Sequence, residues 1–532
     1  MSQHVVTILD ITGIQAYIFG SNKLRDNIGA SQLVEWATKQ WLYETLNRVG
    51  GAQITVNADD TFSTPAIDDK KVQAEPIYAG GGNAVILFAN LEQAKSWATA
   101  YSRHLLQHAP GLGFAIVHSP GFAWEPEGKD LRQIIDKLKN NAVVIAKQTA
   151  QTSVPLLGLG VTATCQSTGL AAVEYYKEAE GTYRPVSSEV QAKLFDKVQQ
   201  GADSRFYKIF RSFAQLGSPP AYDFDDLVGG DGQSRDQGYI AVVHADGNAM
   251  GQVFQQISKV ELTNRLYIQA VRTLSAQVQQ AGLRALEHAL GSLIGPDAQL
   301  ISPFQNRKRF PVRPIVYGGD DVTFVCDGQL GLALAARYLH AFEQATKETV
   351  GSPLTACAGI AIVKVHYPFA RAYDLSEALC GHAKGWVRRS SSAMDWHIAA
   401  SGLLGDLGDI REREYTVKAG KLTLRPIRLH DQPNEWRTWP AFRTMLHTFM
   451  EREEWAGKRN KVMRLREVLR EGSDRTRQFL KLYRLNSLPS YAQAPADLAE
   501  QGWISSDNER VCGYFDVIEA LEFFVLLEGE EL

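Results

Sequence analysis

Residues 317–321 read Tyr-Gly-Gly-Asp-Asp, and they join two runs rich in β-forming residues, 311–316 and 322–325. The pattern predicts a β-hairpin, because glycine adopts the positive φ angles of a tight turn and lets another group approach the backbone closely. Asp320 and Asp321 place two carboxylates at this turn, and oxygen ligands are those that Mg²⁺ prefers. A turn of this kind is also found without chemistry, since Gly and Asp favour turns for local reasons.

A third carboxylate follows an apolar run earlier in the same half of the chain. Residues 238–245 form a predicted strand that ends at Asp246. A helix at about 260–290, the hairpin, a helix at about 329–349 and a strand at 354–363 follow it. This is the β-α-β-β-α-β order of a ferredoxin-like fold. With acids at these two places, it is the layout of a nucleotidyl-transferring palm domain.

The N-terminal part of the chain repeats this layout. Its first strand also ends in an acid, Asp10, and a glycine hairpin around Gly82 follows. Asp10 and Gly82 are 72 residues apart, and Asp246 and Asp320 are 74 residues apart. The two spacings indicate a duplicated domain, so we expect an α+β protein with two palm domains.

The first copy lacks the hairpin acids, because Gly82 and Asn83 stand in their place. It is therefore predicted to hold no metal pair. The backbone N–H groups of a glycine hairpin and of a strand-to-helix turn still suit a nucleotide phosphate. The alternative is that this copy is only a structural scaffold.

Six landmarks of the sequence resemble, in order, those of the large palm-domain subunit of type III CRISPR effector complexes. They are residues 10–20, 24–25, 29–31, 80–83, 244–251 and 318–321. The resemblance covers about residues 1–405. Several motifs in the same order occur by chance much less often than a single motif does. It implies a cyclase that joins ATP into cyclic oligoadenylate second messengers in antiviral defence. It also implies CRISPR RNA and other effector subunits as partners.

The predicted site combines the acids with backbone groups and one lysine. Asp246 and Asp320, with Asp321 as helper, are expected to be catalytic and to hold one or two Mg²⁺ or Mn²⁺ ions, which would activate a ribose hydroxyl of ATP. The resemblance assigns the triphosphate to Lys384, although an exposed helix lysine is ordinary. The predicted nucleotide-binding residues are Gly247, Asn248, Gly251, Gly318, Gly319 and Lys384 in the second copy, and Gly80, Gly81 and Gly82 in the first.

Two departures from that family change the expected activity. The first palm strand begins within a few residues of Met1, so we expect no HD nuclease domain and no DNA cleavage by this chain. Only Cys165 lies where members often carry paired cysteines, and zinc usually needs four ligands. We therefore expect no zinc, and the segment 151–235 is interpreted as a remnant of a zinc-site region.

The predicted organisation is a degenerate first palm at 1–150, the segment 151–235, a second palm at 236–405 and a helical C-terminal domain at 406–532. A glycine-rich loop at 229–234 ends the segment, and the tail 528–531 is acidic. Helices are expected at 436–483 and 517–527 by their amphipathic pattern.

Composition sets the broad class. The chain has 532 residues and a formal net charge of −3, which argues against a uniformly basic nucleic-acid binder. Its five cysteines form no CxxC pair, and no signal peptide or membrane-spanning run is present. We expect free thiols, a cytoplasmic location and no membrane partner.

Two alternatives remain open. A diguanylate cyclase uses the same palm, but its hairpin continues with Glu-Phe where this chain has Asp321-Val322. A non-catalytic scaffold subunit of a CRISPR ribonucleoprotein would keep the fold and lose the chemistry.

Overall fold

A computed structural model describes residues 3–57, 60–69, 71–149, 158–178, 181–214, 216, 218–228, 238–257, 261–399, 405–506 and 509–527. The glycine-rich loop at 229–234 and the acidic tail lie outside these residues. The chain forms two compact units, which are described separately: residues 1–211 with 249–281, and residues 212–248 with 282–532.

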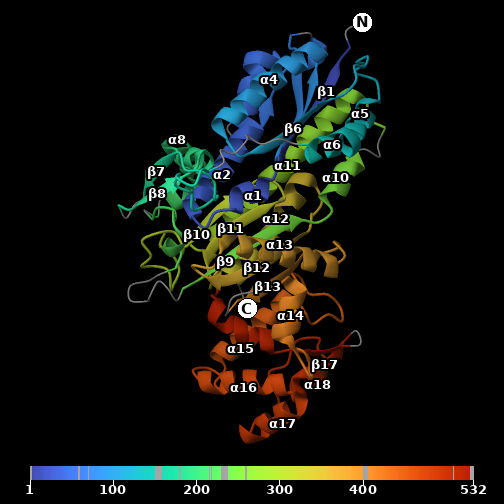
Figure 1. The fold of residues 1–532 in the computed structure, drawn as a ribbon. Coiled ribbons are helices and arrows are strands. Elements are labelled where there is room, and N and C mark those ends of the chain that lie inside the picture. Colours follow the sequence, from blue (N-terminus) through green and yellow to red (C-terminus); the bar gives the residue numbers. More distant parts are fainter. Residues whose placement is uncertain are drawn as a thin grey trace. The chain divides into compact units, whose positions relative to one another are not determined.

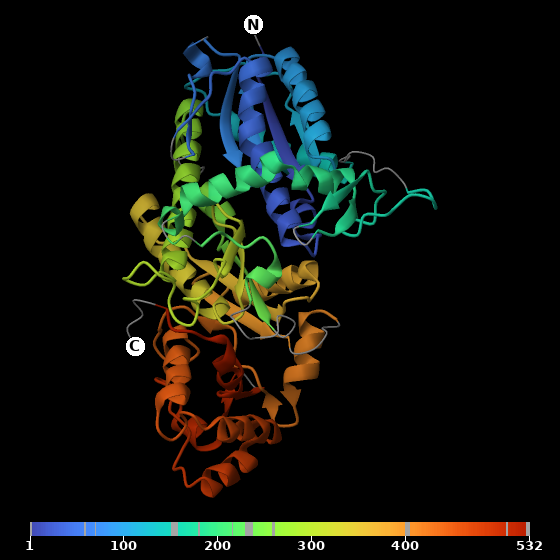
Figure 2. The same ribbon diagram turned by 90° about the vertical axis from the view of Figure 1, so that its left-hand side faces the viewer.

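The first unit contains an antiparallel four-stranded sheet with the order β4-β5-β1-β6. Its strands are β1 (Val5–Thr12), β4 (Ala74–Gly80), β5 (Asn83–Phe88) and β6 (Gly113–His118). The predicted first strand that contains Asp10 and the predicted glycine hairpin around Gly82 are thereby confirmed as elements. The blue strands of this sheet lie among helices of the same unit in Figures 1 and 2.

Helices cover both faces of this sheet. On one face, α4 (Leu91–His108) places Trp97 against Phe88 of β5. On the other face, α5 (Leu131–Lys137) packs Leu131 and Ile135 against alternate strand residues such as Val6. Alternate burial of this kind follows from the two-residue period of a strand. The helical stretch of α2 (Leu24–Glu35), η1 (Trp36–Gln40), α3 (Trp41–Thr45) and η2 (Leu46–Gly50) precedes β4.

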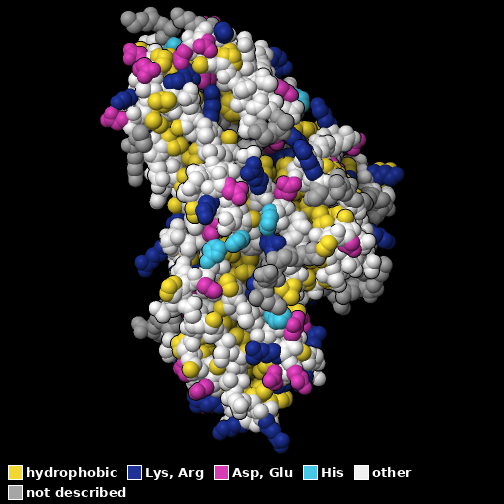
Figure 3. Space-filling model, turned by 180° about the vertical axis from the view of Figure 1, so that it is seen from behind, with side chains coloured by type: hydrophobic (Ala, Val, Ile, Leu, Met, Phe, Trp, Pro, Cys, Tyr) yellow, Lys and Arg dark blue, Asp and Glu magenta, His cyan; other side chains and the backbone are white. Residues whose placement is uncertain are grey.

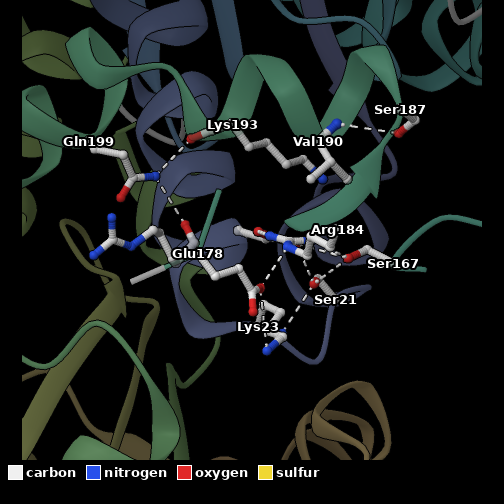
Figure 4. A network of polar contacts seen from close by, with 11 residues as sticks. Ser21, Lys23, Ser167, Glu178, Arg184, Ser187, Val190, Lys193 and Gln199 are labelled. Carbon is white, nitrogen blue, oxygen red and sulfur yellow. Dashed lines mark hydrogen bonds and ion pairs between the residues drawn. The ribbon is translucent and has the colours of Figure 1, made fainter. Parts of the chain in front are cut away.

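The segment after the first palm packs on α2 through a buried polar network (Figure 4). It contains β7 (Glu174–Lys177), β8 (Tyr183–Val186), α7 (Ser188–Leu194) and α8 (Asp196–Ile209). Arg184 donates to Asp26 at 2.6 Å, and both side chains are buried. Ser167 and Ser21 also donate to Asp26, at 3.0 and 2.8 Å. These bonds satisfy a carboxylate that would otherwise be costly to bury.

The second unit contains a six-stranded sheet with the order β10-β11-β9-β12-β13-β16. Its strands are β9 (Tyr239–Gly247), β10 (Val312–Val316), β11 (Val322–Asp327), β12 (Ala356–Lys364), β13 (Ala393–Ile398) and β16 (Ile427–Arg428). The first four strands are antiparallel and repeat the hairpin-centre-edge order of the N-terminal sheet. The expectation of two palm domains is confirmed.

Two helices lie on opposite faces of this sheet. In β12, a Cβ added at Gly359 would lie 1.9 Å from the Ser376 carbonyl of α13 (Phe369–Trp386). A Cβ added at Gly331 of α12 (Gly331–Val350) would lie 3.1 Å from the neighbouring β12 residue, Ile360. Successive strand residues face opposite sides, so α13 and α12 cover different faces. A third helix, α11 (Asn264–Gly291), enters this unit at Gly282.

The C-terminal part is helical, but it also contains a small sheet that the sequence analysis missed. Its helices are α14 (Leu407–Tyr415), α15 (Trp439–Glu451), α16 (Arg459–Glu471), α17 (Ser473–Leu482), α18 (Ala496–Gln501) and α19 (Phe515–Ala520). The sheet has the order β14-β15-β18-β17, from β14 (Thr416–Val417), β15 (Gly420–Lys421), β17 (Trp503–Ser506) and β18 (Glu509–Cys512). Strands of two to four residues are too short to show a period. The helix expected at 517–527 is also wrong in its bounds, since α19 ends at Ala520.

The five cysteines are free and buried, as expected. Burial raises the pKa of the Cys326 thiol well above its usual value.

His397 makes the stability of the second unit depend on pH. Its side chain on β13 is fully buried, and burial together with Arg425 and Arg411 lowers its pKa to about 3. Below pH 6.5 the unfolded chain binds a proton that the folded chain does not, so stability falls as the pH drops from 6.5 towards 3. We expect His397 to contribute a loss of about 1.4 kcal/mol per pH unit in this window.

Urea unfolding of the wild type and of His397→Phe at pH 7.0 and 5.5 measures this contribution. The wild type should lose more stability between the two pH values than the variant does. Equal losses in the two proteins would contradict the assignment to His397.

Candidate active site

The Gly-Gly-Asp-Asp hairpin is held at the end of the central strand by strand register. Val322 of β11 pairs with Ala245 of β9, which brings Asp321 opposite the carboxyl end of β9. The N–H of Gly247 donates to the carbonyl of Asp320 at 3.1 Å. Gly318 and Gly319 have φ angles of 115° and 98°, which L side chains rarely adopt. The glycines are therefore required by the turn itself.

The hairpin is also supported from behind by α11. A Cβ built at Gly282 would lie 2.0 Å from the carbonyl oxygen of Gly319. Contacts this close are possible only for a residue without a side chain. The helix backbone therefore fixes the position of the turn that carries the two acids.

Three carboxylates crowd the site, and their charges act on one another. Burial, followed by the charge of Asp246, raises the pKa of Asp320. Burial and the charges of Asp246, Asp320 and Glu377 raise the pKa of Asp321 to about 8. Because 51% of the Asp321 side chain is exposed, the neighbouring carboxylates are the main physical cause of this rise in pKa. A divalent cation would relieve this repulsion, and carboxylates are suitable ligands for Mg²⁺ or Mn²⁺.

A lysine ammonium already lies against one of these acids. Lys384 of α13 donates to Asp246 Oδ2 at 2.5 Å and to the carbonyl of Gly247 at 2.9 Å. The side chain is only 10% exposed, so the reading of Lys384 as an ordinary exposed helix lysine is wrong. As the side chains lie, no group of three or more His, Cys, Asp or Glu residues in the described part of the chain is arranged to hold a metal ion. Metal binding at these acids would require Lys384 to release Asp246.

Asn248 is hydrogen-bonded within the fold, and its contact with a nucleotide stays a prediction. Its side-chain amide donates to Thr355 Oγ1 at 2.9 Å and to the carbonyl of Ser391 at 3.0 Å. Its backbone N–H donates to the carbonyl of Thr355. The residue is buried and ties the turn after β9 to two neighbouring segments. Its donors are thus committed within the fold.

Sequence reasoning missed two residues beside the acids. His244 is buried on β9, with Nδ1 3.1 Å from Thr323 Oγ1 and 3.6 Å from Asp321 Oδ1. Burial lowers the pKa of His244, so the imidazole is neutral at pH 7. Glu377 of α13 adds a fourth carboxyl group, whose charge also raises the pKa of Asp321. The two-residue period of a strand could have identified His244, because it shares a face with Asp246.

Comparison with known proteins agrees with this geometry. Residues 239–393 match the family model described as Cas10/Cmr2, second palm domain. The second palm of this chain is therefore similar to that family. No curated protein matches it.

Solved structures of a Csm1–Csm4 cassette share the Cas10-like fold. The complex with cA4 has a TM-score of 0.52 at 14% identity, and the match covers 98% of this chain and 69% of that chain. The complex with cA3 has a TM-score of 0.53 at 14% identity, covering 98% and 70%. The complex with one ATP has a TM-score of 0.52 at 15% identity, covering 98% and 70%. These values establish the fold.

The corresponding place in the first palm has a similar lysine. Lys147 of α6 (Val144–Gln148) lies 2.9 Å from Asp10 Oδ1, at the end of β1. The N–H of Ile11 donates to the carbonyl of Gly82 at 2.7 Å, which fixes the glycine hairpin as in the second palm. No carboxylate is present at this hairpin, because Gly82 is followed by Asn83.

The second unit thus brings together most of the predicted site. Asp246, Gly247, Gly318, Gly319, Asp320, Asp321 and Lys384 come from β9, the β10–β11 hairpin and α13. Gly251 on α10 (Met250–Ile257) and the glycines Gly80, Gly81 and Gly82 belong to the first unit. Their roles towards a nucleotide stay predictions. Among the described residues we find no helix with the length and apolar character that a bilayer crossing requires.

Proposed function

We propose that this chain is a metal-dependent nucleotide cyclase that converts ATP into cyclic oligoadenylates in CRISPR-type antiviral defence. The observation that carries the proposal is the cluster of Asp246, Asp320 and Asp321 at the hairpin of a Cas10-like second palm. Carboxylates that repel one another in the absence of a cation are costly for the fold. Their retention therefore favours a function at this place over a structural role.

The acids and the lysine would have different functions in the reaction. Asp246, Asp320 and Asp321 would hold Mg²⁺ or Mn²⁺, which would neutralise triphosphate charge and lower the pKa of the attacking hydroxyl. The Lys384 ammonium is paired with Asp246. It could release this carboxylate and pair with a triphosphate oxygen while staying in the site. The exchange conserves one ion pair, so it costs little. Gly318 and Gly319 leave the approach to the hairpin free of side chains.

The first palm would hold a second nucleotide through its glycine hairpin. Lys147 keeps Asp10 paired, so Asp10 is a poor metal ligand as it lies. Backbone N–H groups of Gly80, Gly81 and Gly82 would contact phosphates.

The choice of ATP and of partners rests on the similar solved structures. Their descriptions name cA4, cA3 and ATP as ligands and Csm4 as a companion of Csm1. We extend these properties to the chain as proposals: adenine as the base, other effector subunits and CRISPR RNA as partners, and the cytoplasm as the location. A scaffold role remains the alternative, and the Lys384–Asp246 pair is the observation that favours it.

Pyrophosphate release tests the proposal. The purified chain, alone and assembled with its RNA-bound partners, would be given ATP, GTP or CTP with Mg²⁺, Mn²⁺ or EDTA. We expect release from ATP, dependent on the metal ion. A fully assembled complex that releases no pyrophosphate from any nucleotide would support the scaffold.

A further inference from the structure

A second concave site lies in the second unit, on the α12 side of its sheet and thus opposite α13 and Lys384. It is a cavity of about 700 Å³ formed by α11, α12, α15 and the loop after β16. This volume is within the range of sites for small-molecule ligands. The cavity shares no residue with the carboxylate site.

Basic side chains dominate the lining of this cavity. Six of them converge from four elements: Arg284, His288, Arg337, His340, His430 and Arg443. Two acids oppose them. Glu348 lies at the edge of the cavity, and Glu343 accepts from His430 at 2.6 Å and from Ser392. Histidine and basic side chains also lie near one another on the face seen in Figure 3.

The basic groups are close enough to destabilise one another's charges. Burial and then Arg337 and His340 lower the pKa of His288. Burial and then His430 lower the pKa of His340, while Glu343 acts in the opposite direction. The rings of His340 and His430 are 5.5 Å apart. A bound anion would stabilise the protonated form of these histidines and the charges of the arginines beside them.

We propose that this cavity, which we call the basic pocket, binds the phosphate groups of a nucleotide or of an RNA strand. Arginine presents a planar fork of donors that matches phosphate oxygens, and the histidines add single N–H donors. Three arginines on three different helices surround the ligand and can contact more than one phosphate group. The proposal does not depend on catalysis at the carboxylate site.

Substitution of two arginines of the basic pocket tests this proposal. Arg284→Gln with Arg443→Gln removes two charges that line the basic pocket from two different helices, α11 and α15. Lys347→Gln with Arg464→Gln removes two exposed charges outside it and serves as the matched control. Arg284→Lys with Arg443→Lys keeps the charge. Binding of tripolyphosphate and of a fluorescent oligoadenylate RNA would be measured in EDTA, by calorimetry and by anisotropy.

The pocket variant should bind at least one of these probes about tenfold more weakly or worse, a loss of about 1.4 kcal/mol. The control should bind as the wild type does, and the lysine variant should retain most of the affinity. Loss for tripolyphosphate alone identifies a small phosphate ligand, whereas loss for RNA alone identifies a strand backbone. Unchanged binding of both probes in a variant that melts like the wild type would overturn the proposal. An equal loss for poly-glutamate would also overturn it, because the pocket would then select charge and not phosphate.

Discussion

Replacement of both Asp320 and Asp321 by alanine should reduce nucleotide turnover about a thousandfold or more, which corresponds to about 4 kcal/mol of transition-state stabilisation. The two acids are the hairpin ligands for the metal ions in the proposed mechanism. Rates of product formation at saturating ATP and Mn²⁺ would measure the effect. Asp497→Ala with Glu500→Ala, two exposed acids on α18, gives the matched loss of charge.

The same variant should be at least as stable as the wild type. The charge of Asp246 raises the pKa of both Asp320 and Asp321, so removing these two acids relieves repulsion in the folded state. Thermal unfolding would show a midpoint that is unchanged or higher. An inactive variant with a much lower midpoint of thermal unfolding would mean that the acids stabilise the fold. The loss of turnover would then not support a catalytic role for them.

Gly282→Ala should impair the enzyme even though it lies on a helix and carries no functional group. A Gly-to-Ala change inside a helix normally stabilises it by roughly 0.5–1 kcal/mol. Here the new Cβ would lie 2.0 Å from the Gly319 carbonyl, so the helix or the hairpin must move. Overpacking of this kind costs typically about 1–3 kcal/mol. We expect a similar loss of stability and a fall in turnover of about a hundredfold.

Gly291→Ala is the matched control for this change. It lies at the end of the same helix, and a Cβ there would meet nothing within 4 Å. Its turnover should equal that of the wild type, and its stability should be equal or slightly higher. If Gly282→Ala behaves like Gly291→Ala in urea unfolding and in turnover, then α11 does not position the hairpin.

Much of the second palm could be predicted because its signals are local. The strand predicted at 354–363 is β12 at Ala356–Lys364, and the helix predicted at 329–349 is α12 at Gly331–Val350. The order of strands and helices placed Asp246 at the carboxyl end of the central strand and Asp320 at the hairpin beside it. Val322 of β11 pairs with Ala245 of β9, and this register brings the hairpin acids beside Asp246.

Other features depend on contacts between distant segments. From the sequence alone, Gly282 is a residue that lowers the stability of its helix. Its close approach to the Gly319 carbonyl explains why a glycine is needed there. Lys384 reaches Asp246 because Gly359 lets α13 lie directly on β12. The pattern of one helix contains no information about either contact.

The C-terminal part shows the same limit for short elements. Lys421 of β15 pairs with Val511 of β18, ninety residues later in the chain. Asp516 of α19 accepts from the N–H groups of Leu424 and Arg425, which fixes the loop beyond β15. These long-range contacts stabilise strands whose own sequences are too short to predict.

Mass spectrometry of the products formed from ATP and Mn²⁺ tests the central claim most directly. It would compare the wild type with Asp320→Ala/Asp321→Ala, both assembled with RNA-bound partners. The account predicts cyclic adenylates, in which every monophosphate unit is internally linked and no triphosphate end remains, from the wild type alone. Cyclic adenylates from both proteins, or unchanged ATP with both, would contradict it.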